Sequence, residues 1–174
     1  MIQPGQILVA HPEMKRGFFT RSVVLITEHH ANGTVGITLN HQSEMVFSDV
    51  MYSKGIEWPY EDKLYRGGPV NPTALVCVHT SEWYSSNTLQ VSADFAISSD
   101  HLMTEKMSMG NTPASYRFTT GVSGWAPGQL ENEMRQGSWL SCWATLDLVF
   151  GFTGDQQWRK SIDCCAKEAV QSYL

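Results

Sequence analysis

The sequence contains no run of basic residues, and its 12 lysines and arginines are outnumbered by 17 aspartates and glutamates, which gives a formal net charge of -5. Tight binding to nucleic acids depends largely on basic side chains that neutralise phosphates, so we do not expect direct DNA binding. The densest basic group is Lys15, Arg16 and Arg21, which we interpret as part of a solvated loop. Charge therefore argues against a nucleic-acid-binding protein.

Long apolar stretches are also missing. No segment approaches the roughly 20 apolar residues that a membrane-spanning helix needs. The first residues, MIQPGQILVAHP, lack the basic region and apolar run of a signal peptide. We therefore expect a cytoplasmic protein that does not enter the membrane. A chain of 174 residues fits one domain, and we predict a single domain over residues 1–174.

Only four cysteines are present, Cys77, Cys142, Cys164 and Cys165, and no two of them form a CxxC pair. The spacing argues against a zinc ribbon and a thioredoxin-type motif. Adjacent Cα atoms, as in Cys164 and Cys165, lie about 3.8 Å apart, which is below the roughly 4.4–6.8 Å typical of a disulfide. In a reducing cytosol we expect four free thiols, with neither a metal site nor a cofactor.

The common catalytic motifs are incomplete or missing. No GxxxxGK[ST] stretch indicates a P-loop. GVSGW at 121–125 begins like the nucleophile elbow of a hydrolase, but Trp125 replaces the final glycine and no histidine follows His101. His29 and His30 are adjacent on a predicted strand, so they point to opposite faces and cannot chelate one ion. The sequence therefore favours a protein without catalysis of its own over an enzyme.

Short strands and helices alternate without a strict strand–helix–strand repeat. Apolar runs between turn signals predict strands at 6–10, 22–29, 34–40, 63–66, 74–80, 89–92, 95–98, 115–122, 138–145 and 146–150. Helical spacing between capping and stop residues predicts helices at 44–51, 99–110, 127–137 and 155–174. This order predicts one mixed domain of the α+β class.

Ala31-Asn32-Gly33 is a strong hairpin signal between the second and third predicted strands. A register with Asn32-Gly33 as the loop places four polar residues on one face, beside the space left by Gly36: Thr27, His29, Thr38 and Asn40. This stripe is either a polar pocket or a solvated face with Gly36 as a packing notch. We favour the solvated face, because half-exposed antiparallel sheets are common. Glu28 falls on the apolar face, where it would need a cation such as Arg66.

The stretch RGGPV at 66–70 also has two interpretations. Gly67 and Gly68 could present their backbone N–H groups as an anion-binding nest, with Arg66 beside it. Alternatively, Gly-Gly-Pro simply forms a turn, which is the interpretation we favour.

GWAPGQLENEM at 124–134 predicts the start of a helix with Pro127 at its first position. Glu131 suits a helix N-terminus and can pair with Arg135 one turn later. Trp125 is expected to be a buried anchor. Gln129 has no local role in this scheme.

If this loop packs against the hairpin and the RGGPV turn, Gln129 would hydrogen-bond Glu28 or a ligand beside Arg66. Glu131 would then form a buried ion pair with Arg66 in place of the surface pair with Arg135.

In order and spacing, four stretches together resemble the YqgE/AlgH family of bacterial proteins: GQILVAHPEM, FFTRSVVLITEHHANGTVGITLN, LYRGGPV and GWAPGQLENEM. The resemblance implies a mixed α+β fold with a bifurcated, partly barrel-like sheet flanked by helices. It implies no settled activity and transfers no catalytic residue. One branch of the family is labelled a transcriptional regulator of alginate synthesis, without a defined DNA-binding motif.

We therefore predict a cytoplasmic bacterial protein that acts as a non-catalytic binding or regulatory module, including indirect regulation of transcription, with a protein partner. The alternative is a ligand-binding protein or enzyme for a small anion, with a polar site near the RGGPV turn. The candidate site residues are Glu28, His29, Asn40, Arg66, Gly67, Gly68, Gln129 and Glu131. A concave polar pocket joining the hairpin to the turn would favour the ligand, and a flat apolar patch would favour a protein partner.

Overall fold

The computed structural model describes residues 1–14 and 17–173, so Lys15 and Arg16 of the basic group lie outside the described residues. The strands are β1 Gln6–Ala10, β2 Val23–His30, β3 Gly33–Thr38, β4 Leu64–Arg66, β5 Val70–Thr80, β6 Leu89–Gln90, β7 Phe95–Ser98, β8 Tyr116–Trp125 and β9 Trp139–Trp143. The helices are the 3-10 helix Gly17–Phe19, α1 Phe47–Ser53, α2 His101–Ser108, α3 Gln129–Arg135, α4 Leu146–Phe150 and α5 Gly154–Gln171.

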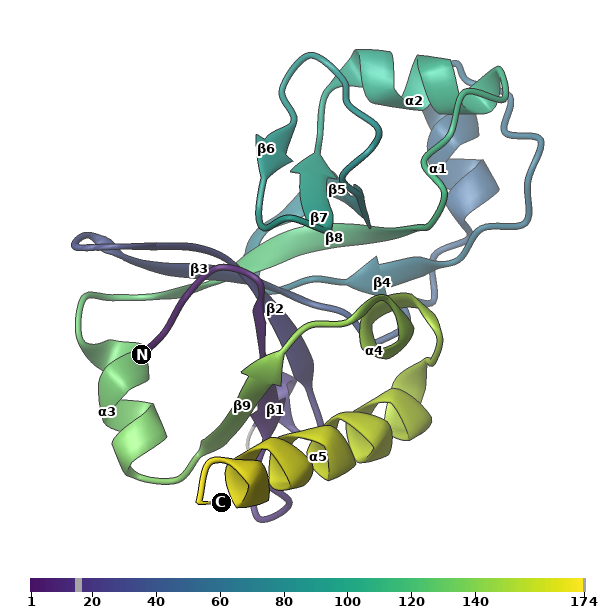
Figure 1. Cartoon of the computed structure of the whole chain (residues 1–174). Coiled ribbons are helices and arrows are strands. Elements are labelled where there is room, and N and C mark those ends of the chain that lie inside the picture. The colour runs from purple at the N-terminus through teal and green to yellow at the C-terminus, as the bar shows by residue number, and fades with distance from the viewer. Residues whose placement is uncertain (15–16, 174) are drawn as a thin grey trace.

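The strands form one curled, largely antiparallel sheet in the order β6-β7-β5-β8-β3-β2-β1-β9, with β4 also paired to β8 (Figure 1). The sheet divides at β8. The first part of β8 pairs with β4 in parallel and with β5 in antiparallel orientation, whereas its last three residues pair with β3. The predicted α+β fold with a bifurcated, partly barrel-like sheet flanked by helices is thus confirmed.

Strands β1 and β2 are buried on both faces, which explains their nearly unbroken apolar sequences. Ile7, Val9 and Leu25 belong to the core that includes residues of α4 and α5. Leu8 and Val24 belong to a second core that includes Trp125 and Trp139. A third core lies around α1 and α2 and the strands beside them. No helix in the described part of the chain has both the length and the apolar character that a membrane crossing requires.

A buried arginine connects the two parts of the sheet to helix α5. The Arg117 guanidinium of β8 donates to the Gln157 side-chain oxygen of α5 at 2.7 Å and to the Leu39 and Phe152 carbonyl oxygens at 2.8 Å each. Burial lowers the pKa of Arg117, but three of its five N–H donors have these acceptors, and the guanidinium also lies 4.7 Å from the Tyr65 ring centre. The sequence analysis did not single out this structural arginine.

One predicted element was wrong, and another began later than expected. Residues 146–150 were expected to be a strand but form helix α4, because the Thr145 side chain accepts a hydrogen bond from the Leu148 N–H at 3.2 Å and caps a helix there. Pro127 was expected at the first position of the helix predicted at 127–137, but that helix, α3, begins at Gln129 after Gly128. Gly128 has φ +81°, a conformation that favours glycine.

The hairpin forms as predicted, but in a different register. Gly33 pairs with His30, so the loop is Ala31-Asn32, and a bulge at Thr27 shifts the pairing so that Ile26 opposes Gly36. A Cβ on Gly36 would lie 2.7 Å from Val24 and 3.3 Å from the Trp125 ring. The expected open space is therefore filled. Thr27, Thr38 and Asn40 are buried, and only His29 of the four is partly exposed. The favoured solvated face is therefore wrong, and Gly36 is a packing notch within the core.

Candidate functional site

Three of the predicted site residues lie near the tip of the hairpin. The His29 Nε2 is 3.6 Å from a Glu131 carboxylate oxygen, and its Nδ1 is 2.7 Å from the Thr34 hydroxyl. These residues border a shallow cleft of about 360 Å³. Glu28 is half-exposed and 3.8 Å from His30, so it is not the buried carboxylate that would have needed Arg66. An anion in this cleft would face the Glu131 carboxylate.

The RGGPV residues lie elsewhere, where the chain crosses β8. The Gly67 N–H donates to the Thr120 carbonyl at 2.7 Å, so it is not free to bind an anion. A Cβ on Gly68 would lie 2.1 Å from the Val122 backbone. The two glycines therefore permit a close approach of two backbones, and the anion nest is not formed as hypothesised. Arg66 is exposed, with its guanidinium 5.8 Å from the Phe18 ring centre.

The last two predicted site residues make local or structural hydrogen bonds. The Asn40 amide accepts from the Val23 N–H at 2.9 Å and donates to the Arg21 and Gly154 carbonyls. Gln129 is explained locally, because its side-chain oxygen accepts from the Ala126 N–H at 3.0 Å and closes the turn before α3.

The predicted residues therefore do not form one site. No hydrogen bond or ion pair found among the described residues joins Arg66 to Glu28, Gln129 or Glu131, and the predicted surface pair of Glu131 with Arg135 is not formed among them either. The Glu131 carboxylate instead lies 3.6 Å from the His29 Nε2.

A larger cleft, of about 800 Å³, opens on the other side of α3. It lies between the end of α3, the start of β9 and the N-terminal segment around the 3-10 helix. Its described lining residues are His11, Glu13, Met14, Phe19, Glu133, Gln136, Gly137, Ser138, Trp139 and Leu140. We call it the Trp139 cleft.

Phe19 and Trp139 line the Trp139 cleft and form an aromatic cluster with the buried Trp125. Phe19 stacks on Trp125, with 5.7 Å between ring centres and 22° between planes, and meets Trp139 edge-on at 5.3 Å. Trp125 and Trp139 also meet edge-on at 6.1 Å. Such aromatic pairs contribute about 0.5–1.5 kcal/mol each beyond the burial of their area. The rings thus give the cleft a rigid apolar surface.

Glu133 is the carboxyl residue of the Trp139 cleft that approaches the indole rings. Its Oε2 and the Trp139 Nε1 are buried, and neither has a hydrogen-bond partner among the described residues. Burial raises the pKa of the Glu133 carboxyl. The indole N–H groups of Trp139 and Trp125 approach the carboxyl and lower its pKa, but their geometry falls short of a full hydrogen bond. A carboxylate in such surroundings is costly to keep charged unless a cation pairs with it. A cation over an aromatic face gains further stabilisation.

Sequence analysis missed this cleft, although one signal was present. Leu130 and Met134 define the apolar stripe of α3, and Glu133 stands three residues after Leu130, close to that stripe. A carboxylate beside an apolar stripe indicates either a buried hydrogen-bond or ion-pair partner or a binding site. The meeting of Glu133 with Phe19 and Trp139 depends on the pairing of β9 with β1, which local patterns do not reveal.

A separate group of potential metal ligands, Cys142, Cys164 and Glu168, lies between β9 and α5.

A family model and several relatives match this chain over nearly its whole length. A family model described as AlgH-like matches residues 7–169. A UPF0301 protein of Marinomonas sp. (strain MWYL1) is 32% identical over 157 residues, covering 88% of this chain and 84% of the relative. A UPF0301 protein of Stenotrophomonas maltophilia (strain K279a) is 33% identical over 157 residues with the same coverage.

Two solved structures share the fold. The solution structure of the AlgH protein from Pseudomonas aeruginosa matches with a TM-score of 0.79 at 24% identity, covering 92% of this chain and 87% of that chain. The crystal structure of a Corynebacterium diphtheriae protein matches with a TM-score of 0.75 at 27% identity, covering 92% and 85%.

Proposed function

We infer a function for this chain from the premise that it belongs to the AlgH-like family: it is a non-catalytic binding or regulatory module of the bacterial cytoplasm. The observation that carries the proposal is the Glu133 carboxyl, which lies at the aromatic Trp139 cleft with one oxygen unpartnered among the described residues. A group that costs free energy to bury, at the surface of an open cleft, is typical of a binding site.

The chemistry of the cleft favours an arginine side chain from a protein partner. Glu13 and Glu133 are among the described lining residues, which include no lysine or arginine. A guanidinium can pair with a carboxylate and stack on aromatic rings at the same time. Its apolar stem would cover Met14 and Phe19, as long basic side chains commonly do on apolar surfaces.

The alternative of a small anionic ligand has less support. The Glu131 carboxylate lies beside His29 at the smaller cleft near the hairpin tip, where it would repel an anion. The Gly67 N–H is already hydrogen-bonded to the Thr120 carbonyl. Both features oppose an anion at the residues first considered for it.

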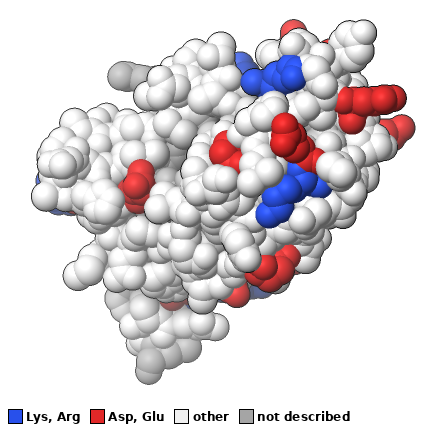
Figure 2. Space-filling view, turned by 90° about the horizontal axis from the view of Figure 1, so that it is seen from above, with Lys and Arg blue, Asp and Glu red and all other residues white. Residues whose placement is uncertain are grey.

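Any role in transcription would then be indirect, through a protein partner. The net charge is -5, and Figure 2 shows charges of both signs interspersed on one face without a basic stripe. DNA binding would require basic groups along the contact surface.

The test compares N-acetyl-arginine amide with N-acetyl-citrulline amide, its uncharged analogue of similar shape. Both are titrated into the full chain while the indole N–H signals are followed by NMR. We expect the arginine compound to shift the signals of Trp139 and Trp125, with weaker shifts from citrulline. Glu133→Gln should abolish the preference for arginine, and Glu131→Gln, on the other side of α3, should retain it. Equal responses to both compounds, or no shift at Trp139, would overturn the proposal.

A further inference from the structure

Helix α5 and strand β9 bring together three potential metal ligands that are distant in sequence. The sulfurs of Cys142 and Cys164 and a carboxylate oxygen of Glu168 all lie within 4.8 Å of one another. Cys142 projects from β9, whereas Cys164 and Glu168 are one turn apart on α5 and therefore share a face of that helix. No metal site was expected from the sequence, because no CxxC pair is present and the adjacent His29 and His30 cannot chelate one ion.

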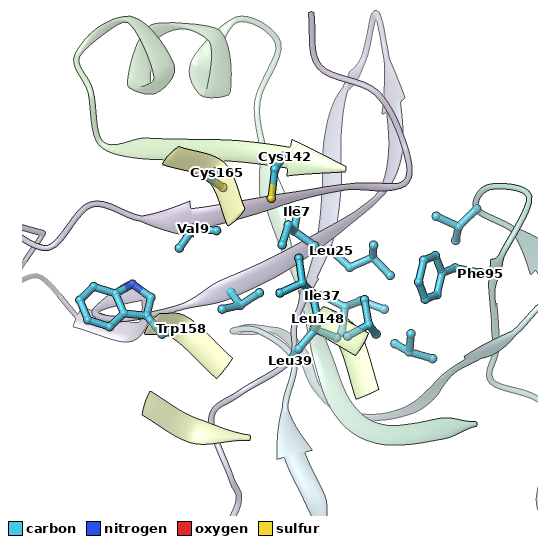
Figure 3. Close-up of a cluster of buried hydrophobic side chains, with 14 of the residues drawn as sticks. Ile7, Val9, Leu25, Ile37, Leu39, Phe95, Cys142, Leu148, Trp158 and Cys165 are labelled. Carbon is cyan, nitrogen blue, oxygen red and sulfur yellow. The ribbon is translucent and has the colours of Figure 1, made fainter. Parts of the chain in front are cut away.

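The fold positions each member of this group. Cys142 is 2% exposed and lies in the core between β9 and α5, where its side chain and that of Cys165 approach one another (Figure 3). The Glu168 Oε1 accepts a hydrogen bond from the Trp143 N–H at 3.4 Å, which holds the carboxylate beside the end of β9. Cys164 and Glu168 are only partly buried, so an ion can reach the group from solvent.

We propose that Cys142, Cys164 and Glu168 bind one Zn²⁺ ion. Thiolates and carboxylates are both zinc ligands, and a Zn–S bond of about 2.3 Å places two thiolates on one tetrahedral ion roughly 3.8 Å apart. The observed separations of up to 4.8 Å are close enough for small side-chain rotations to complete the geometry. The fourth position would be taken by a water molecule or by the Cys165 thiolate.

The charges of the ligand set also suit a dication. Without a metal the two cysteines are neutral thiols, and Zn²⁺ offsets most of the charge of the two thiolates and one carboxylate that form when it binds. The thiols must lose their protons to bind, so each ion bound should release protons to the solution. The site would fasten the C-terminal helix to strand β9 and thereby stabilise the fold.

The test uses Co²⁺ as a spectroscopic substitute for Zn²⁺ on the reduced, full-length protein kept under anaerobic conditions. We expect one Co²⁺ per chain, sulfur-to-cobalt charge-transfer absorption in the near ultraviolet, and displacement by one equivalent of Zn²⁺. Zn²⁺ should also raise the melting temperature. Cys164→Ser and Glu168→Gln carry the test, because both residues are partly exposed and their loss should leave the fold intact, whereas Cys142→Ser alters the core.

Removing an outer-shell partner of a metal site already costs about 10–100-fold in affinity, so Cys164→Ser should weaken binding at least that much, and Glu168→Gln should weaken it about tenfold or more. Cys77→Ala, at a buried cysteine outside the group, is the control and should bind like the wild type. Absence of stoichiometric binding by the folded wild type would overturn the proposal. Binding that is unchanged in Cys164→Ser would do the same.

Discussion

The Glu131 carboxylate lies 3.6 Å from the His29 imidazole, so the start of α3 closes on the hairpin and not on Arg66. The sequence analysis considered a buried Glu131–Arg66 pair, which would have joined the two motifs in the core. The observed pair is partly exposed, and Arg66 lies at the surface. This contact defines the rotation of α3 about its axis: Glu131 faces the hairpin, and Glu133 faces the Trp139 cleft.

The first prediction is that Glu131 contributes little to stability. Exposed charge contacts are worth about 0.2–1 kcal/mol, so Glu131→Ala should lower the free energy of unfolding by less than about 1 kcal/mol. Arg135 is exposed and has no ion pair among the described residues, so Arg135→Ala should cost as little. Urea unfolding measures both. A loss of several kcal/mol in Glu131→Ala, coupled to Arg66→Ala in a double mutant, would show that the two side chains do meet.

The second prediction is that Trp125 is an anchor of the fold. Its ring is 4% exposed, stacks on Phe19 and fills the notch at Gly36. Trp125→Ala should therefore cost about 3–5 kcal/mol of unfolding free energy or prevent folding. Trp143→Ala is the matched control, because Trp143 is 48% exposed, and it should cost far less. Similar losses for the two variants in urea unfolding would argue against an anchoring role.

The third prediction concerns the crossing of backbones at Gly68. A Cβ there would lie 2.1 Å from Val122, so Gly68→Ala must push the two segments apart. Overpacking of this kind costs about 1–3 kcal/mol or more. Gly124→Ala is the control, since a Cβ at Gly124 would meet nothing within 4 Å. If Gly68→Ala unfolds at the same urea concentration as Gly124→Ala, the close crossing is wrong.

The fourth prediction is a loss of stability in mild acid through His79. This ring is fully buried, with Nδ1 2.9 Å from the Thr80 carbonyl oxygen and Nε2 2.8 Å from the Ser98 hydroxyl. Burial lowers the pKa of His79, and the Thr80 carbonyl and Glu82 only partly oppose this. The native state therefore keeps the ring neutral, whereas the unfolded chain takes up a proton below about pH 6.5.

The stabilising contribution of His79 is thus complete above about pH 6.5 and is lost as the pH falls toward the lower pKa of the native state. An NMR titration of the His79 ring gives its pKa in the native state. Urea unfolding at several pH values gives the change in the free energy of unfolding. A native pKa for His79 at or above about 6.5 would contradict the prediction.

Much of the fold could be predicted because its signals are local. The apolar runs of β1 and β2, the Ala31-Asn32-Gly33 turn and the amphipathic pattern of α5 all indicated the correct elements. The hairpin register could not be predicted, because the bulge at Thr27 shifts the pairing without leaving a mark in the apolar alternation. Helix α4 was missed although Thr145 supplied a capping signal.

The candidate site was harder to predict because it depends on long-range pairing. The pair Gly67-Gly68 indicated an unusual backbone conformation or a close contact. These glycines are needed because the chain crosses β8 at close range there, and no local motif reveals that crossing. Glu133 and Trp139 meet only because β9 pairs with β1 and places Trp139 opposite Ala10. Sequence patterns thus predicted which segments are unusual but not which of them lie together.

The most direct test of the binding proposal is the ratio of affinities for the arginine and citrulline compounds, measured by calorimetry on the wild type and on Glu133→Gln. A hydrogen bond to a charged group is worth about 1.5–3 kcal/mol, which corresponds to at least about a tenfold preference for arginine in the wild type. The account predicts that this preference falls to nearly one in Glu133→Gln while both proteins remain folded. A preference that is absent in the wild type, or that persists in Glu133→Gln, would contradict the assignment of the Trp139 cleft as a cation-binding site.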